Sequence, residues 1–92
     1  MLAEARELYN YTVGNEPFRS QIEEIRDNHT DYVMAKIKIR SIVFSADLQY
    51  GKDYCSCGKS CFTIQDIDSV FVKILGDMYD LWWQGRIRKW KQ

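Results

Sequence analysis

Residues 62–85, FTIQDIDSVFVKILGDMYDLWWQG, form the longest stretch of the chain with one clear period. Thr63 and Asp66 have the spacing of a capping box in which Asp replaces the usual Glu or Gln. Apolar residues then recur at the spacing of a helix that lies on a core, namely Ile64, Ile67, Phe71, Ile74, Leu75, Met78 and Trp82. We therefore predict a long amphipathic helix that begins near Thr63 and ends near Gly85.

Two shorter helices are predicted before this stretch. Residues 2–12 consist largely of good helix formers. Gly14 and Asn15, which tolerate positive φ, interrupt the pattern. Pro17 suits the first turn of a second helix, which we expect to run to about Asp27.

The period changes to two in the middle of the chain. Apolar residues alternate with Met, Lys and Arg over residues 33–40, VMAKIKIR. This alternation is typical of a half-buried strand, whose outer face would carry Lys36, Lys38 and Arg40. Residues 51–53 resemble a turn, and residues 54–57 and 60–62 one or two further strands. The predicted fold is α+β: two short N-terminal helices, an antiparallel β-hairpin or three-stranded sheet, and a long C-terminal helix packed on it.

Length and charge limit the class of protein. The 92 residues suffice for one domain, expected over residues 1–85, with residues 86–92 as a basic C-terminal tail. The formal net charge is zero, so no overall field attracts the chain to nucleic acid or to a membrane. The sequence shows neither an export signal nor an apolar run long enough to span a membrane. A cytoplasmic protein without a membrane partner is expected.

The three cysteines form the most conspicuous local pattern. Cys55, Cys57 and Cys61, together with His29, could supply the four donors of a structural zinc site. The C-x-C-x3-C spacing differs from that of zinc knuckles, and these positions share parity along a predicted strand. Small apolar residues packed on one face are therefore the favoured interpretation. A zinc-stabilised domain and a reactive thiol are the alternatives.

Other candidate chemistry is weaker. Gly58-Lys59-Ser60 resembles the end of a phosphate-binding loop, but Asp53 occupies the position of the required first glycine. His29, with Asp27 and Asp31 as neighbours, fits an exposed loop residue. The carboxylates after Thr63 fit helix capping and a solvated helix face; they are Asp66, Asp68, Asp77 and Asp80. We therefore predict no enzymatic activity, no cofactor and no bound metal.

The end of the long stretch carries more aromatic side chains than one small core can cover. A helix makes more than one full turn over residues 78–83, MYDLWW. Helix 2–12 could cover part of this surface. The predicted protein-binding residues combine Trp, Tyr and Arg, which dominate interface hot spots, with a neighbouring lysine: Tyr79, Trp82, Trp83, Arg86, Arg88, Lys89 and Trp90.

These features favour a small binding protein that docks on a larger protein. Its size and layout are those of phage or mobile-element proteins that inhibit a host enzyme or defence complex. The alternative is a nucleic-acid-binding module, which would use the basic strand face and the C-terminal tail. A homodimer is a further possibility, because a symmetric partner can bury an apolar helix face.

Overall fold

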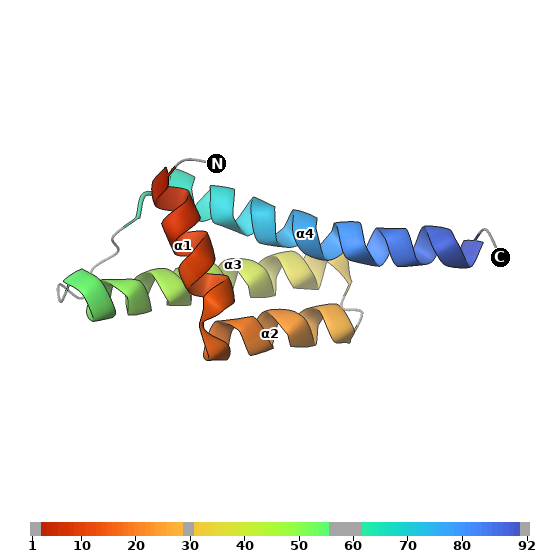
Figure 1. Ribbon diagram of the computed structural model, residues 1–92, viewed down its shortest axis with the longest axis horizontal. Coiled ribbons are helices and arrows are strands. Elements are labelled where there is room, and N and C mark those ends of the chain that lie inside the picture. The colour runs from red at the N-terminus through yellow and green to blue at the C-terminus, as the bar shows by residue number, and fades with distance from the viewer. Residues whose placement is uncertain (1–2, 29–30, 56–61, 91–92) are drawn as a thin grey trace.

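The protein is a helical bundle. The computed structural model describes residues 3–28, 31–55 and 62–90, and it describes the backbone alone for Cys55 and residues 79–90. Four α-helices and one π-helical turn make up this part of the chain (Figure 1): α1 (Ala3–Gly14), α2 (Glu16–Asp27), α3 (Tyr32–Tyr50), η1 (Gly51–Cys55) and α4 (Ile64–Trp90). No strand occurs within the described ranges. The predicted α+β fold is therefore wrong.

The residues predicted as the first strand belong to α3. Asp31 caps this helix, because its Oδ1 accepts a hydrogen bond from the Met34 amide at 3.1 Å. The buried residues that follow are spaced as on a helix, at Ala35, Ile39, Ile42, Val43 and Ala46. A strand would place Ile37 and Ile39 on the same face, but Ile37 is 60% exposed and Ile39 is fully buried.

The second predicted strand and its turn are also wrong where the structure describes them. Residues 51–53, expected to reverse the chain, continue α3 into the π-helical turn η1. Tyr54 and the backbone of Cys55 lie in that turn. The rest of the predicted strand region, residues 56–61, lies outside the described residues.

The two N-terminal helices are confirmed. Asn15 separates α1 from α2 in an extended conformation, with φ −102° and ψ 129°. Pro17 lies in the first turn of α2, where its missing amide costs nothing. The side chain of Asn15 reaches back to α1, because its Nδ2 donates to the Tyr11 carbonyl.

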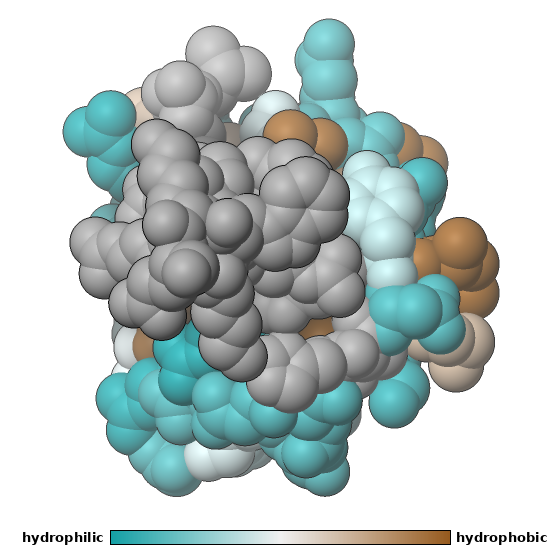
Figure 2. All heavy atoms as spheres, turned by 90° about the vertical axis from the view of Figure 1, so that its right-hand side faces the viewer, coloured by the Kyte–Doolittle hydropathy of each residue, from teal (hydrophilic) through white to brown (hydrophobic). Residues whose placement is uncertain are grey.

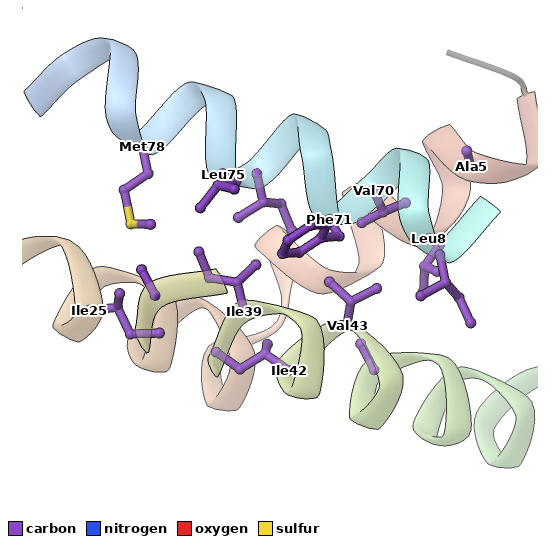
Figure 3. Close-up of a cluster of buried hydrophobic side chains, with 14 residues drawn as sticks. Ala5, Leu8, Ile25, Ile39, Ile42, Val43, Val70, Phe71, Leu75 and Met78 are labelled. Atoms are coloured by element: carbon purple, nitrogen blue, oxygen red, sulfur yellow. The ribbon is translucent and has the colours of Figure 1, made fainter. Parts of the chain in front are cut away.

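The first half of α4 supplies one side of the core. Five residues of the predicted stripe are buried, namely Ile67, Phe71, Ile74, Leu75 and Met78. Ile64, at the first helical position, is exposed instead, and the side chain of Trp82 lies outside the described residues. Figure 3 shows Phe71, Leu75 and Met78 pointing toward Ile39 of α3. Leu8 of α1 and Ile25 of α2 complete the same cluster.

The second half of α4 leaves the bundle. The predicted end at Gly85 is wrong, because the helix continues through that residue to Trp90. Its 27 residues correspond to about 40 Å of helix, and the molecule measures 53 × 24 × 21 Å along its principal axes. Figure 1 shows α4 running past the ends of α2 and α3. Within the described ranges, no helix is both long enough and apolar enough to cross a membrane.

Candidate functional site

The predicted binding residues all lie in α4. The backbone of Tyr79, Trp83, Arg86 and Trp90 is helical, and these residues are four, three and four positions apart. On an α-helix this spacing places them on one face. Their side chains, and those of Trp82, Arg88 and Lys89, lie outside the described residues, so their role in binding stays a prediction.

The same face begins inside the bundle. Val72, Tyr79 and Arg86 are seven residues apart, and so are Gly76, Trp83 and Trp90. We call this set of six residues the α4 heptad face. Its two described members are open to solvent: Val72 is 62% exposed, and a Cβ placed on Gly76 would meet no atom within 4 Å.

Helices α1 and α3 cover other faces of α4. From α1, the Tyr9 hydroxyl donates to Oδ2 of Asp77 at 2.8 Å, and Lys73 donates to Oδ1 of the same carboxylate at 3.0 Å. Burial and the hydrogen bond to Asp77 raise the pKa of Tyr9. Helix α1 therefore contacts α4 on the Lys73–Asp77 side and leaves Val72 open, whereas cover of the aromatic side chains after Met78 by α1 stays a prediction.

On its other side α4 meets α3 at Arg40. The guanidinium of Arg40 forms an ion pair with Asp68 at 3.1 Å and lies 5.8 Å from the centre of the Phe71 ring. The groups are about half exposed, so this pair orients the two helices more than it stabilises them. The α4 heptad face lies between the α1 contact and the α3 contact.

A second apolar surface, missed by the sequence analysis, lies on the outside of α3. Val33, Ile37, Phe44 and Leu48 are all exposed, and steps of four, seven and four residues place them within one side of the helix. We call this set the α3 outer face. Its helical spacing was visible in the sequence, but the strand prediction assigned Val33 and Ile37 to the buried side.

Figure 2 shows the surface of the molecule coloured by hydropathy. The view looks along α4 from its C-terminal end, and apolar atoms reach the surface beside hydrophilic ones.

A groove of about 370 Å³ lies between α2 and α3, next to the α3 outer face. Three isoleucines and five polar residues line it, among them Glu24 of α2 and Lys38 of α3. The groove therefore joins the α3 outer face through Ile37.

The basic residues expected on a strand face are spread around α3. Consecutive residues of a helix differ by about 100°, so Lys38 lies far around the helix from Lys36 and Arg40. Arg40 is paired with Asp68, and the Lys36 ammonium lies 5.1 Å from the centre of the Tyr32 ring. The continuous basic strip that the nucleic-acid alternative required is therefore not formed by these three residues.

Tyrosines gather where α1 meets the end of α3. The rings of Tyr11 and Tyr50 lie 5.2 Å apart edge to face, and those of Tyr50 and Tyr54 lie 4.6 Å apart. The Tyr11 hydroxyl donates to Asp53, whose other oxygen accepts from Gln49 at 3.0 Å. Burial and the hydrogen bond to Asp53 raise the pKa of Tyr11 to about 12. At neutral pH this phenol is a hydrogen-bond donor that connects α1 to η1.

The carboxylates of α4 that the structure describes have structural partners. Asp66 belongs to the helix cap, Asp68 pairs with Arg40, and Asp77 accepts from Tyr9 and Lys73. The interpretation as capping residue is confirmed for Asp66, which caps α4 from a buried position. Asp68 and Asp77 are surface residues, as expected. Asp80 lies outside the described side chains.

The predicted zinc alternative cannot be placed. His29, Cys57, Cys61 and the side chain of Cys55 lie outside the described residues. Among the side chains that are described, no group of three or more His, Cys, Asp or Glu residues could hold a metal ion. Packed thiols, a zinc site and a reactive thiol therefore stay as predictions from the sequence.

Neither protein-family models, nor curated proteins, nor solved structures give a match to this chain. The fold and the two apolar faces are therefore the features from which a function can be proposed.

Proposed function

We propose that this protein is a non-catalytic binding protein that docks on a larger protein through the α4 heptad face. The observation that carries the proposal is the continuity of α4, which runs unbroken from the core through Gly85 to Trp90. Residues 86–90, which were expected to belong to a tail, are thereby part of a helix that the bundle already orders. A helix ordered before binding loses less conformational entropy when it meets its partner.

The composition of this face supports docking on a protein. Tyr79, Trp83, Arg86 and Trp90 are residue types that dominate hot spots. A helix that presents such residues at heptad-like spacing suits an apolar groove on a partner. Arg86, with Arg88 and Lys89 nearby, favours a groove with acidic residues at its rim.

For the biological setting we propose a phage or mobile-element inhibitor of a host enzyme or defence complex. Small size and a single helical bundle support this proposal by analogy alone. Binding of nucleic acid through Arg86, Arg88 and Lys89 is the alternative. Four bases in the last seven residues would give binding that falls steeply as salt rises.

Affinity capture with matched variants tests the docking proposal. The wild-type chain, Trp83→Ala and Ile64→Ala would each be used to retain partners from the native cell, and a retained protein would then be purified and titrated with each chain. Ile64 is exposed at the other end of α4, outside the heptad face. We expect a partner that binds the wild type and Ile64→Ala but not Trp83→Ala.

Thermal unfolding decides what a loss of binding means. An interface role for Trp83 requires that Trp83→Ala melts within a few degrees of the wild type. A buried Trp would instead cost about 3–5 kcal/mol when truncated, and a melting shift of that size would overturn the proposal. Equal binding by all three chains would also overturn it, as would retention by nucleic acid that disappears at physiological salt.

A further inference from the structure

The spacing of the α3 outer face is the same in either direction along the helix. Val33 and Ile37 are separated by four residues, as are Phe44 and Leu48. The midpoint of the set falls between Arg40 and Ser41. An antiparallel copy of the same helix therefore meets this face in register, with Val33 opposite Leu48 and Ile37 opposite Phe44. Such self-complementarity is the requirement of a two-fold symmetric interface.

We propose that a second copy of this chain covers the α3 outer face, and that the protein is a two-fold dimer with antiparallel α3 helices. This interface is distinct from the α4 heptad face and does not depend on the function proposed above. The four apolar residues of the face, which α1, α2 and α4 leave exposed, would be buried against their symmetry mates.

The distribution of charge agrees with the antiparallel arrangement. The bases of α3 all lie in its first half, at Lys36, Lys38 and Arg40. The second half, residues 41–50, contains no base, and Asp53 follows in η1. A parallel pair would place base against base, whereas an antiparallel pair places the basic half of one helix against the base-free half of the other.

Little repulsion between like charges is expected at the centre of the proposed interface. Arg40 is the charged residue nearest the symmetry axis, and Asp68 already pairs with it at 3.1 Å. Ser41, beside it, is exposed and small, which allows two helices to approach closely. Lys38 forms no ion pair within the described residues, and it lies toward the groove side of α3.

In the proposed dimer, the groove between α2 and α3 of one copy accommodates the largest side chain of the α3 outer face of the other copy. Ile37, Ser41 and Ile42 line this 370 Å³ hollow from α3, and Ile25 lines it from α2. By the antiparallel register, the residue opposite Ile37 is Phe44 of the second copy. We infer that each Phe44 ring enters the groove of the other copy, so that two identical contacts form.

Two complementary variants test the register directly. The molecular mass of the purified chain would be measured by sedimentation equilibrium across a concentration series. We expect the wild type to dimerise. Ile37→Lys and Phe44→Glu, each alone, should raise the dimer dissociation constant by about 100-fold or more, because each substitution acts twice in a symmetric dimer. An equimolar mixture of the two variants should dimerise again, since the introduced lysine of one chain then meets the introduced glutamate of the other.

The mixing experiment distinguishes this interface from non-specific association and from misfolding. Rescue in the mixture shows that both variants are folded and that positions 37 and 44 face each other. Ile64→Lys, at an exposed position outside the face, and Trp83→Ala should both dimerise like the wild type. A wild type that stays monomeric at all concentrations overturns the proposal, and so do variants that dimerise unchanged or a mixture that stays monomeric.

Discussion

Thr63 and Asp66 exchange hydrogen bonds at the start of α4. The Thr63 amide donates to Oδ2 of Asp66 at 3.2 Å, and the Asp66 amide donates to Oγ1 of Thr63 at 3.1 Å. This is the reciprocal pattern of a capping box, with Asp in the place of the longer Glu. Asp66 is buried, and the cap marks where α4 begins.

The cap gives a first prediction. Thr63→Ala removes the hydroxyl that accepts from the Asp66 amide, and it should lower the free energy of unfolding by about 1 kcal/mol. Thr63→Ser keeps the hydroxyl and should stay close to the wild type. Urea denaturation followed by circular dichroism measures both. Equal stability of Thr63→Ala and the wild type would show that the cap contributes nothing.

Ile37 and Ile39 give a second prediction, which tests whether this part of the chain is the helix α3 and not the strand expected from the sequence. Ile39→Ala should cost about 2–5 kcal/mol, because it leaves a cavity among the side chains shown in Figure 3. Ile37→Ala, at a residue that is 60% exposed in one copy of the chain, should leave the unfolding of the monomer nearly unchanged. Both variants are measured at a low protein concentration. Similar costs at the two positions would instead indicate the alternating burial of a strand.

Gly76 gives a third prediction. It lies inside α4, where glycine is less favourable than alanine by about 1 kcal/mol. A Cβ at this position would meet no atom within 4 Å, so Gly76→Ala should stabilise the protein by up to about that amount. The melting temperature reports the gain, and a lower melting temperature would mean that the face at Gly76 is closed.

Tyr11 gives a prediction for alkaline pH. Its pKa is raised from 10.0 to about 12 in the folded protein, so the neutral phenol is favoured by folding. This contribution is complete below pH 10 and is lost as the pH rises from about 10 to about 12. Tyr11→Phe should therefore show a smaller loss of stability across that range than the wild type. Melting temperatures from pH 9 to pH 12 test this, and parallel curves would contradict it.

The helical parts of the chain could be predicted where the period was unambiguous. The boundary between α1 and α2 was marked by Gly14, Asn15 and Pro17, whose backbone preferences are local. The capping box and the buried half of α4 likewise depend on residues close together in sequence. These elements were confirmed because their local signals agree with the way the bundle packs.

The middle of the chain could not be assigned because two periods share residues. Ala35 and Ile39 fit both an alternating strand and a helical stripe, and β-branched Val33 and Ile37 favoured the strand. The decision rests on Ile42, Val43 and Ala46, which bury one side of α3 against α1, α2 and α4. Burial of that kind depends on residues distant in sequence, and intrinsic propensity cannot supply it.

The binding role of the aromatic and basic residues of α4 stays a prediction from composition. The sequence also predicts a helix end at Gly85, because glycine is common there. The structure shows instead that the helix continues through it. The α3 outer face was missed for the opposite reason, since apolar residues were assumed to be buried and one small core cannot bury all of them.

Because α4 is continuous, the core of the bundle also determines the position of each residue in its second half around the helix axis. The buried residues from Ile67 to Met78 fix the rotation of α4 about its own axis. Each later residue then lies about 100° further around that axis than the residue before it. One alanine inserted after Met78 would leave the bundle intact and rotate the positions of Trp83 and Trp90 by about 100° around the helix axis. Seven inserted residues would restore these positions around the axis while moving both residues by about 10 Å along it. A partner that recognises this helix therefore recognises an angle set by the core of the bundle.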